Sequence, residues 1–315
     1  MSRPKPKRLA AWACLMIAAV VSPARAKSRA AATNATPSFN GSRAFEDLRR
    51  LVGFGARPSG SNQLALARQW MLGELKKTGA EIEEDKFVAT TPIGQLAMDN
   101  LIAKLPGTKP DIVIIAGHYD TARIPNVNFV GANDGGSSAA LLMELARAVS
   151  GRKYPFTLWL VFFDGEEAAH QWTDTDSLYG SRHFLARLSD SGNLGRVKAM
   201  ILVDMIGDAK LRIYRDENST QWLNDLVFST AKQLGYAKNF LDAPLSVTDD
   251  HMPFVNAGVS AVDLLGNVGP PSPSSSFGAY WHSAKDTVEH CSATSLGIVG
   301  RVVLASLNAL GRQPR

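Results

Sequence analysis

Residues 162–168 read Phe-Phe-Asp-Gly-Glu-Glu-Ala, and they end an apolar run that begins at Phe156. A short, continuous apolar run that is rich in aromatic and β-branched residues is typical of a buried strand. Asp164-Gly165 is a turn pair that ends this strand. Glu166 and Glu167 therefore lie where the chain leaves the sheet, which is the edge where open α/β sheets usually bind ligands.

The two adjacent glutamates allow two interpretations. Neighbouring carboxylates repel each other, and burying either one without a cation or a hydrogen-bond donor is costly. A metal ion would resolve the conflict, with one glutamate binding it and the other transferring protons. A solvated acidic loop is the ordinary alternative for a Glu-Glu pair, so the choice between them depends on the rest of the chain.

The regions around this stretch alternate between apolar strands and amphipathic helices. The predicted strands lie at 81–88, 94–105, 112–116, 156–163, 200–203 and 260–265. The predicted helices lie at 45–51, 64–75, 137–149, 221–234 and 296–310. This alternation predicts an α/β fold, a single domain with a central mixed, mostly parallel β-sheet flanked by helices.

The N-terminal region has the pattern of an export signal. Four basic residues lie among positions 3–8, an apolar stretch follows from Leu9 to Val21, and Ala24-Arg25-Ala26 fits the cleavage rule. A membrane anchor is the alternative, but spanning a bilayer takes about 20 apolar residues. We predict a signal peptide at 1–26, a flexible Ala/Ser/Thr/Asn-rich leader at 27–42 and a catalytic domain at 43–315. The mature protein is then exported, either periplasmic or secreted, and has no membrane attachment.

Removal of the predicted signal peptide would change the net charge and the number of cysteines of the protein. The signal contains five basic residues and no acid, so the formal net charge falls from +5 to zero. The basic isoelectric point is thus a targeting feature and does not indicate a nucleic-acid partner. Cys291 would be the only cysteine left, which excludes an intramolecular disulfide. We expect a monomer.

Further polar residues stand at the ends of strands or the starts of helices. His118 follows the strand at 112–116, and Asp120 is placed to brace its imidazole. Asp134 lies in a glycine-flanked turn before the helix at 137–149, and Asp204 ends the strand at 200–203. Each has a structural alternative: a turn histidine, a helix cap or a loop cap.

Considered together, these residues favour a metal site. Zinc accepts nitrogen and oxygen donors of this kind. The candidate donors are His118, Asp134, Glu167, Asp204 and His282. The sequence does not favour a serine hydrolase, because no Gly-x-Ser-x-Gly elbow follows a strand, or a nucleotide-binding protein, because no glycine-rich phosphate loop is present.

The order of these residues resembles the zinc aminopeptidases of peptidase family M28. Four segments resemble more specifically the glutaminyl-peptide cyclotransferases, which share that fold: residues 162–168, 176–183, 249–254 and Trp281-His282. The resemblance runs from about Phe45 to the C-terminus. It implies an enzyme that converts the N-terminal glutamine of peptides or proteins to pyroglutamate and releases ammonia.

The resemblance also implies roles for individual residues. Zinc would be bound by Asp134, Glu167 and His282, and a second metal could use His118 and Asp204. The catalytic residues would be Glu166 as acid and base, with Asp204 and Asp249 hydrogen-bonding around the reacting groups. The pocket walls would be Trp172 and Trp281.

Several positions depart from the cyclotransferase pattern, and two of them bear on the site. Asp263 stands where animal cyclotransferases place a histidine, and Thr248 stands where glutamine is familiar. A two-zinc aminopeptidase, in which Glu166 activates a metal-bound water, is the main alternative. An exported binding protein that kept the fold without catalysis is the third possibility.

Overall fold

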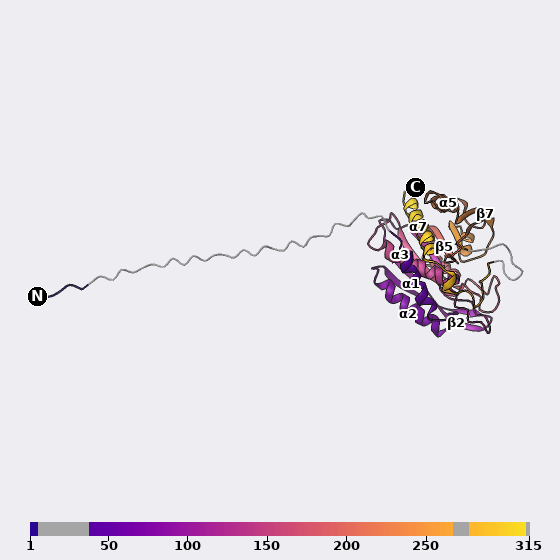
Figure 1. The fold of residues 1–315 in the computed structure, drawn as a ribbon, viewed down its shortest axis with the longest axis horizontal. Coiled ribbons are helices and arrows are strands. Elements are labelled where there is room, and N and C mark those ends of the chain that lie inside the picture. Colours follow the sequence, from indigo (N-terminus) through magenta and orange to yellow (C-terminus); the bar gives the residue numbers. More distant parts are fainter. Residues whose placement is uncertain (6–37, 267–276, 313–315) are drawn as a thin grey trace. The chain divides into compact units, whose positions relative to one another are not determined.

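The computed structural model of this chain describes residues 1–5, 38–266 and 277–312 (Figure 1). Pro37–Arg315 forms one unit, and Met1–Thr36 is separate from it. Almost all of the predicted signal peptide, and the predicted leader up to residue 37, lie outside the described residues.

The central sheet has the spatial order β1-β2-β4-β3-β5-β8 in the described part of the chain. Its strands are β1 Glu81–Thr91, β2 Gly94–Leu105, β3 Ile112–His118, β4 Thr157–Phe163, β5 Val197–Asp204 and β8 Ala261–Leu265. The pairings β1–β2 and β2–β4 are antiparallel, and β4, β3, β5 and β8 run parallel to one another. The predicted mixed, mostly parallel sheet is confirmed.

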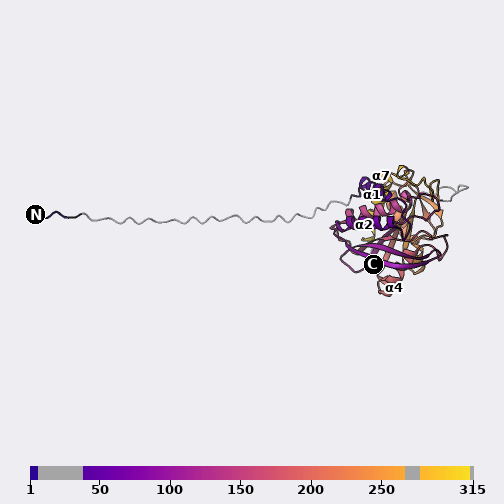
Figure 2. The same ribbon diagram turned by 90° about the horizontal axis from the view of Figure 1, so that it is seen from below.

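Helices cover both faces of this sheet. They are α1 Gly41–Val52, α2 Asn62–Lys76, α3 Ser137–Val149, α4 Tyr179–Asp190, α5 Gln221–Gln233, α6 Met252–Asn256 and α7 Ala293–Leu310. In Figure 2, α1, α2 and α7 lie on the opposite side of the molecule from α4. A second, two-stranded parallel sheet consists of β6 Ile213–Asp216 and β7 Phe240–Leu245, and the sequence did not predict it.

The residues of β3 show why the central strands are continuously apolar. Val113 and Ile115 pack into the core formed with α1, α3 and α7. Ile112 and Ile114, which point the other way, pack with Phe184 of α4 and its neighbours. A parallel strand that is covered on both faces has no solvated side. Polar side chains are therefore confined to the strand ends.

The carboxyl ends of three parallel strands meet at one edge of the sheet. β3 continues two residues beyond the predicted end at Ala116, so that His118 is its last residue and pairs with Phe163, the last residue of β4. β5 ends at Asp204. This edge collects the polar residues that the sequence placed at separate strand ends.

The folded part begins earlier than the predicted boundary at residue 43. Asn40 caps α1 by accepting a hydrogen bond from the backbone N–H of Arg43 at 3.0 Å. Its own backbone N–H donates to Glu144 Oε1 at 3.0 Å. Phe39, only 5% exposed, packs closely against Gly300 of α7. Phe39 of the expected leader thus belongs to the core, and Asn40 belongs to the folded domain as the cap of α1.

α7 is the one helix of the described residues that is long and apolar enough to cross a membrane. In the structure, 61% of that segment is buried inside the protein. It packs against α1, α3 and α5. Burial of this kind is typical of the core helix of a globular domain.

The packing of Phe39 gives a testable expectation. Phe39→Ala should lower the free energy of unfolding by about 3 kcal/mol, because it leaves a cavity between α1 and α7. Urea denaturation of the protein lacking residues 1–26 measures this. Ser38→Ala changes an exposed neighbour and should leave the midpoint unchanged. Equal midpoints for both variants would show that residue 39 is outside the core.

Candidate active site

Asp134 lies in a tight turn, residues 131–136, that leads into α3. Gly131 and Gly135 have φ angles of 51° and 76°, a region that favours glycine. A Cβ on Gly135 would also lie 2.9 Å from Cε1 of His118, so the close approach of the turn to this histidine requires glycine. The Asp134 side chain makes no capping hydrogen bond to α3. The helix-cap interpretation of Asp134 is therefore wrong.

The first group of possible metal donors combines Asp134, Glu167 and His282. His282 Nε2 lies 3.2 Å from Glu167 Oε1 and 3.4 Å from Asp134 Oδ2. Donor atoms of all three residues lie within 4.8 Å of one another. These are the three residues for which the resemblance implied a zinc ion.

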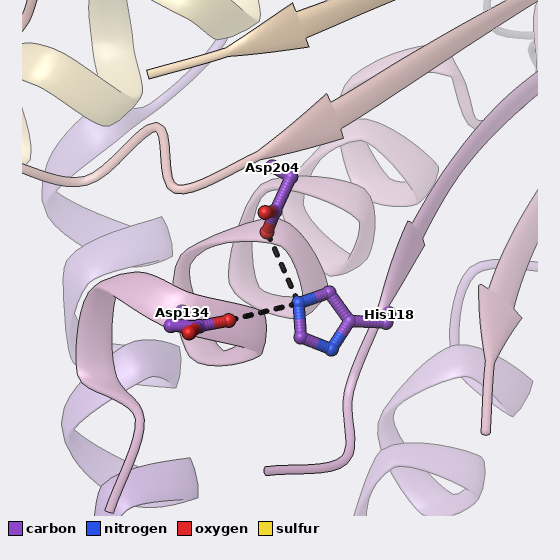
Figure 3. Close-up of side chains that lie close together, drawn as sticks. All are labelled: His118, Asp134 and Asp204. Atoms are coloured by element: carbon purple, nitrogen blue, oxygen red, sulfur yellow. Dashed lines mark hydrogen bonds and ion pairs between the residues drawn. The ribbon is translucent and has the colours of Figure 1, made fainter. Parts of the chain in front are cut away.

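The second group combines His118, Asp134 and Asp204 (Figure 3). His118 Nε2 lies 3.2 Å from Asp134 Oδ1 and 3.1 Å from Asp204 Oδ1. Asp134 thus presents one carboxylate oxygen to each group. All five predicted donors are therefore found in the two groups, which share the carboxylate of Asp134.

The chemistry of these donors fits a metal ion. Asp134 Oδ2 is buried and makes no hydrogen bond among the described residues, and it lies 3.4 Å from His282 Nε2, so carboxylate oxygen and imidazole nitrogen, both donors that zinc accepts, stand side by side. Burial and the charge of Asp134 raise the pKa of Glu167 to about 7. Burial alone would lower the pKa of His282, but Glu167 and Asp134 raise it to about 10. The site attracts positive charge.

Asp120 orients both glutamates as well as His118. Its carboxylate accepts the backbone N–H of Glu166 at 3.3 Å and that of Glu167 at 3.4 Å. Its Oδ1 lies 3.5 Å from His118 Nδ1, where bracing of the imidazole was predicted. The link to the two amides was not predicted, because it depends on how the loop after β4 folds back over β3.

Glu166 is buried but belongs to neither donor group. Its Oε2 lies 3.8 Å from His118 Nδ1. Burial raises its pKa well above the ordinary value; the charge of His118 partly opposes this shift, while Glu167 and Asp249 add to it. A carboxyl group that holds its proton more tightly than usual is suited to exchange it near neutral pH.

One cavity of about 630 Å³ joins the donors to the surface. Its volume is that of a small-molecule site. Trp172 is 42% exposed, and the Trp281 ring stacks on His282 with centroids 3.8 Å apart. The predicted site residues that line the cavity are Asp134, Glu166, Glu167, Trp172, Asp204, Asp249, Trp281 and His282. Thr248 lines it as well, and His118 is buried without lining it.

Behind Asp249 lies a buried acidic group that the sequence did not reveal. Burial and the charge of Asp204 raise the pKa of Asp249 to about 7. His251 Nε2 lies 3.1 Å from Asp216 Oδ2, and its Nδ1 lies 3.9 Å from Asp263 Oδ2. Asp250 is fully buried beside them. Asp263 thus supports the region behind the cavity rather than lining it.

Comparison with known proteins places this site in a family. The model of peptidase family M28 matches residues 100–307. Bovine glutaminyl-peptide cyclotransferase is 30% identical over 295 residues, which cover 82% of this chain and 78% of that protein. The chain belongs to the glutaminyl cyclases of peptidase family M28.

Solved structures agree with this glutaminyl cyclase assignment. An Acidobacteriales bacterium glutaminyl cyclase is 39% identical, with a TM-score of 0.85 over 91% of this chain and 99% of that one. A Zn-dependent exopeptidase from Parabacteroides distasonis is 25% identical, with a TM-score of 0.78 over 89% of this chain and 100% of that one. The fold is thus shared by cyclases and peptidases.

The first donor group predicts the effect of removing its histidine. His282→Ala of this glutaminyl cyclase should lose bound metal, because two carboxylates remain where three donors stood. Metal content after dialysis, measured by atomic emission, tests this. His170→Ala, which changes an exposed histidine outside both donor groups, is the matched control and should retain its metal. Stoichiometric metal in His282→Ala would contradict the donor assignment.

Proposed function

We propose that this protein is a zinc-dependent glutaminyl-peptide cyclotransferase. It converts the N-terminal glutamine of peptides or proteins to pyroglutamate and releases ammonia. One observation carries the proposal: Asp134, Glu167 and His282 meet beside the buried Glu166, in a cavity walled by two tryptophans. The cyclotransferases to which the chain is similar support the choice of substrate.

Asp134, Glu167 and His282 would hold the zinc ion. Bound there, zinc supplies a Lewis acid that polarises the γ-carbonyl of the substrate glutamine. The substrate's own α-amine attacks that carbon. The rest of the catalysis is orientation and proton transfer by the side chains of this chain.

Glu166 transfers the proton. It accepts a proton from the attacking α-amine and returns it to the nitrogen that departs as ammonia. Its buried position, with the pKa raised above the ordinary value, favours both halves of this exchange. Asp120 holds it in place through the Glu166 amide.

Asp204 and Asp249 would hydrogen-bond the amine and the departing nitrogen. Both line the cavity close to Glu166, and both are buried. Trp172 and Trp281 would form the walls that orient the glutamine side chain. The nucleophile and the electrophile belong to one substrate residue. Holding its side chain in the conformation that brings the two together therefore accounts for much of the rate acceleration.

A two-zinc aminopeptidase is the second candidate, and one observation favours it. His118 and Asp204 form a second donor group with the shared Asp134. With a metal there as well, Glu166 would activate water instead of the α-amine. We propose one zinc, at the first group.

We propose further that the enzyme is exported and monomeric, acting on peptides outside the cytoplasm. The basic and apolar pattern of residues 1–26 supports the export.

Product analysis separates the two reactions. Zinc-loaded protein and a short peptide that begins with glutamine should yield the same peptide minus one ammonia, identified by mass spectrometry. The metal-free protein controls for spontaneous cyclisation. Release of free glutamine and a peptide one residue shorter would establish the aminopeptidase instead.

Glu166→Gln tests the proton transfer. The amide keeps the shape of the side chain but cannot accept the proton, so turnover should fall by about 10²–10⁴-fold. Zinc content and the circular dichroism spectrum should stay as in the unaltered protein, because Glu166 is in neither donor group. Turnover within threefold of the unaltered enzyme would contradict this role.

A further inference from the structure

The turn that carries Asp134 is held by a carboxylate from a distant part of the chain. Asp286 accepts the backbone N–H of Asn133 at 2.7 Å with Oδ1 and that of Asp134 at 3.0 Å with Oδ2. Its backbone carbonyl also accepts the N–H of Ala132 at 3.3 Å. Three consecutive amides of the turn therefore bind one residue.

Asp286 also belongs to the turn that carries His282. The backbone N–H of Asp286 donates to the carbonyl of Ser283 at 3.1 Å, and that of Ser283 donates to Tyr280 at 3.2 Å. His282 has a φ angle of 50°, which is uncommon for a residue with a side chain. Such a conformation persists only where the surrounding contacts hold it.

These hydrogen bonds are strong because of where they lie. Asp286 is 2% exposed and both of its carboxyl oxygens accept backbone amides, so water does not compete for these hydrogen bonds. The other side of the turn is held by Arg57, which donates to the carbonyls of Val130 at 2.8 Å and Gly131 at 3.3 Å. Asp286 thus binds the amides of the Asp134 turn, while Arg57 binds the carbonyls of Val130 and Gly131 at its start.

We propose that Asp286 is the positioning residue of the metal site. It ties the turn of Asp134 to the turn of His282, so that the two donors keep the separation that a single metal ion requires. It touches neither the cavity nor the donor atoms and acts only through the backbone. The proposal rests on the zinc site proposed above, but not on the reaction that the site performs.

Asp286→Asn is the sharpest test. The substitution keeps the volume, but it replaces one acceptor by an NH₂ group that faces a backbone N–H. Loss of a residue that orients a metal ligand typically weakens metal binding by about 10–100-fold. We expect a weakening of this size in the zinc dissociation constant, measured by competition with a chromophoric chelator in the absence of peptide.

Asp216→Asn is the matched control. Asp216 is equally buried and accepts two backbone N–H groups, from Asn218 and Val247, but neither belongs to the turn of Asp134. Its zinc dissociation constant should stay within twofold of the unaltered protein. An equal loss of affinity in both variants would overturn the proposal, because any buried Asp→Asn change would then suffice.

Asp286→Glu provides a second test if the asparagine variant does not fold. It keeps the charge but moves the two oxygens by about one bond length, so zinc affinity should again fall. At saturating zinc, the KM for a glutamine peptide should remain unchanged in the folded variants, because the cavity walls are not altered. Unaltered zinc affinity in a folded Asp286→Asn or Asp286→Glu protein would overturn the proposal.

These measurements are independent of the cyclotransferase assignment. Failure of the unaltered protein to cyclise glutamine peptides would leave the zinc affinities of the variants as informative as before. Failure of the zinc prediction would leave the reaction assignment untouched.

Discussion

Burial of negative charge at one edge of the sheet is the constraint on which the rest of this structure depends. Asp134, Glu166, Glu167, Asp204 and Asp249 are all nearly inaccessible to solvent and lie around one cavity. Burying ionised carboxylates without compensating positive charge is costly. Burial and neighbouring acids raise the pKa values of Glu167 and Asp249 to about 7, so that protons can neutralise part of this charge. A bound metal ion compensates the buried negative charge more fully, because it binds several carboxylate oxygens at once.

The fold makes this concentration of charge possible. Apolar strands covered on both faces place their first polar side chains at their carboxyl ends, and the parallel arrangement of β3, β4 and β5 brings those ends to one edge. The backbone compensates locally: Asp120 binds the amides of both glutamates, and Asp286 binds the amides of the Asp134 turn. The carboxylates of Asp120 and Asp286 therefore position the site carboxylates indirectly, by binding the backbone amides of the residues that carry them.

The difference between residues at strand ends and the residues that support them explains what the sequence could and could not predict. A donor at the end of an apolar strand can be recognised locally, so Glu167 and Asp204 were found from pattern, and the parallel sheet implied that they meet. Supporting contacts depend on the paths of loops: Asp286 and Asn133 are separated by 153 positions. No local signal marks Asp286 or Asp216, and β6 and β7 were missed because they are short and only partly buried. The roles of Trp172 and Asp249 came from resemblance alone.

Asp134 lies between the two donor groups and is the one residue that belongs to both of them. Its two oxygens face the two donor groups, so the number of metals bound depends on the neighbours and not on this carboxylate. A peptidase must generate a nucleophile from water, for which two metals are useful. A cyclase receives its nucleophile as part of the substrate and needs only one polarising ion and a base. In this chain His118 Nδ1 faces Asp120 and Glu166 while its Nε2 faces Asp134 and Asp204. His118 thus contacts both carboxylates of the second group and connects that group to Asp120 and Glu166.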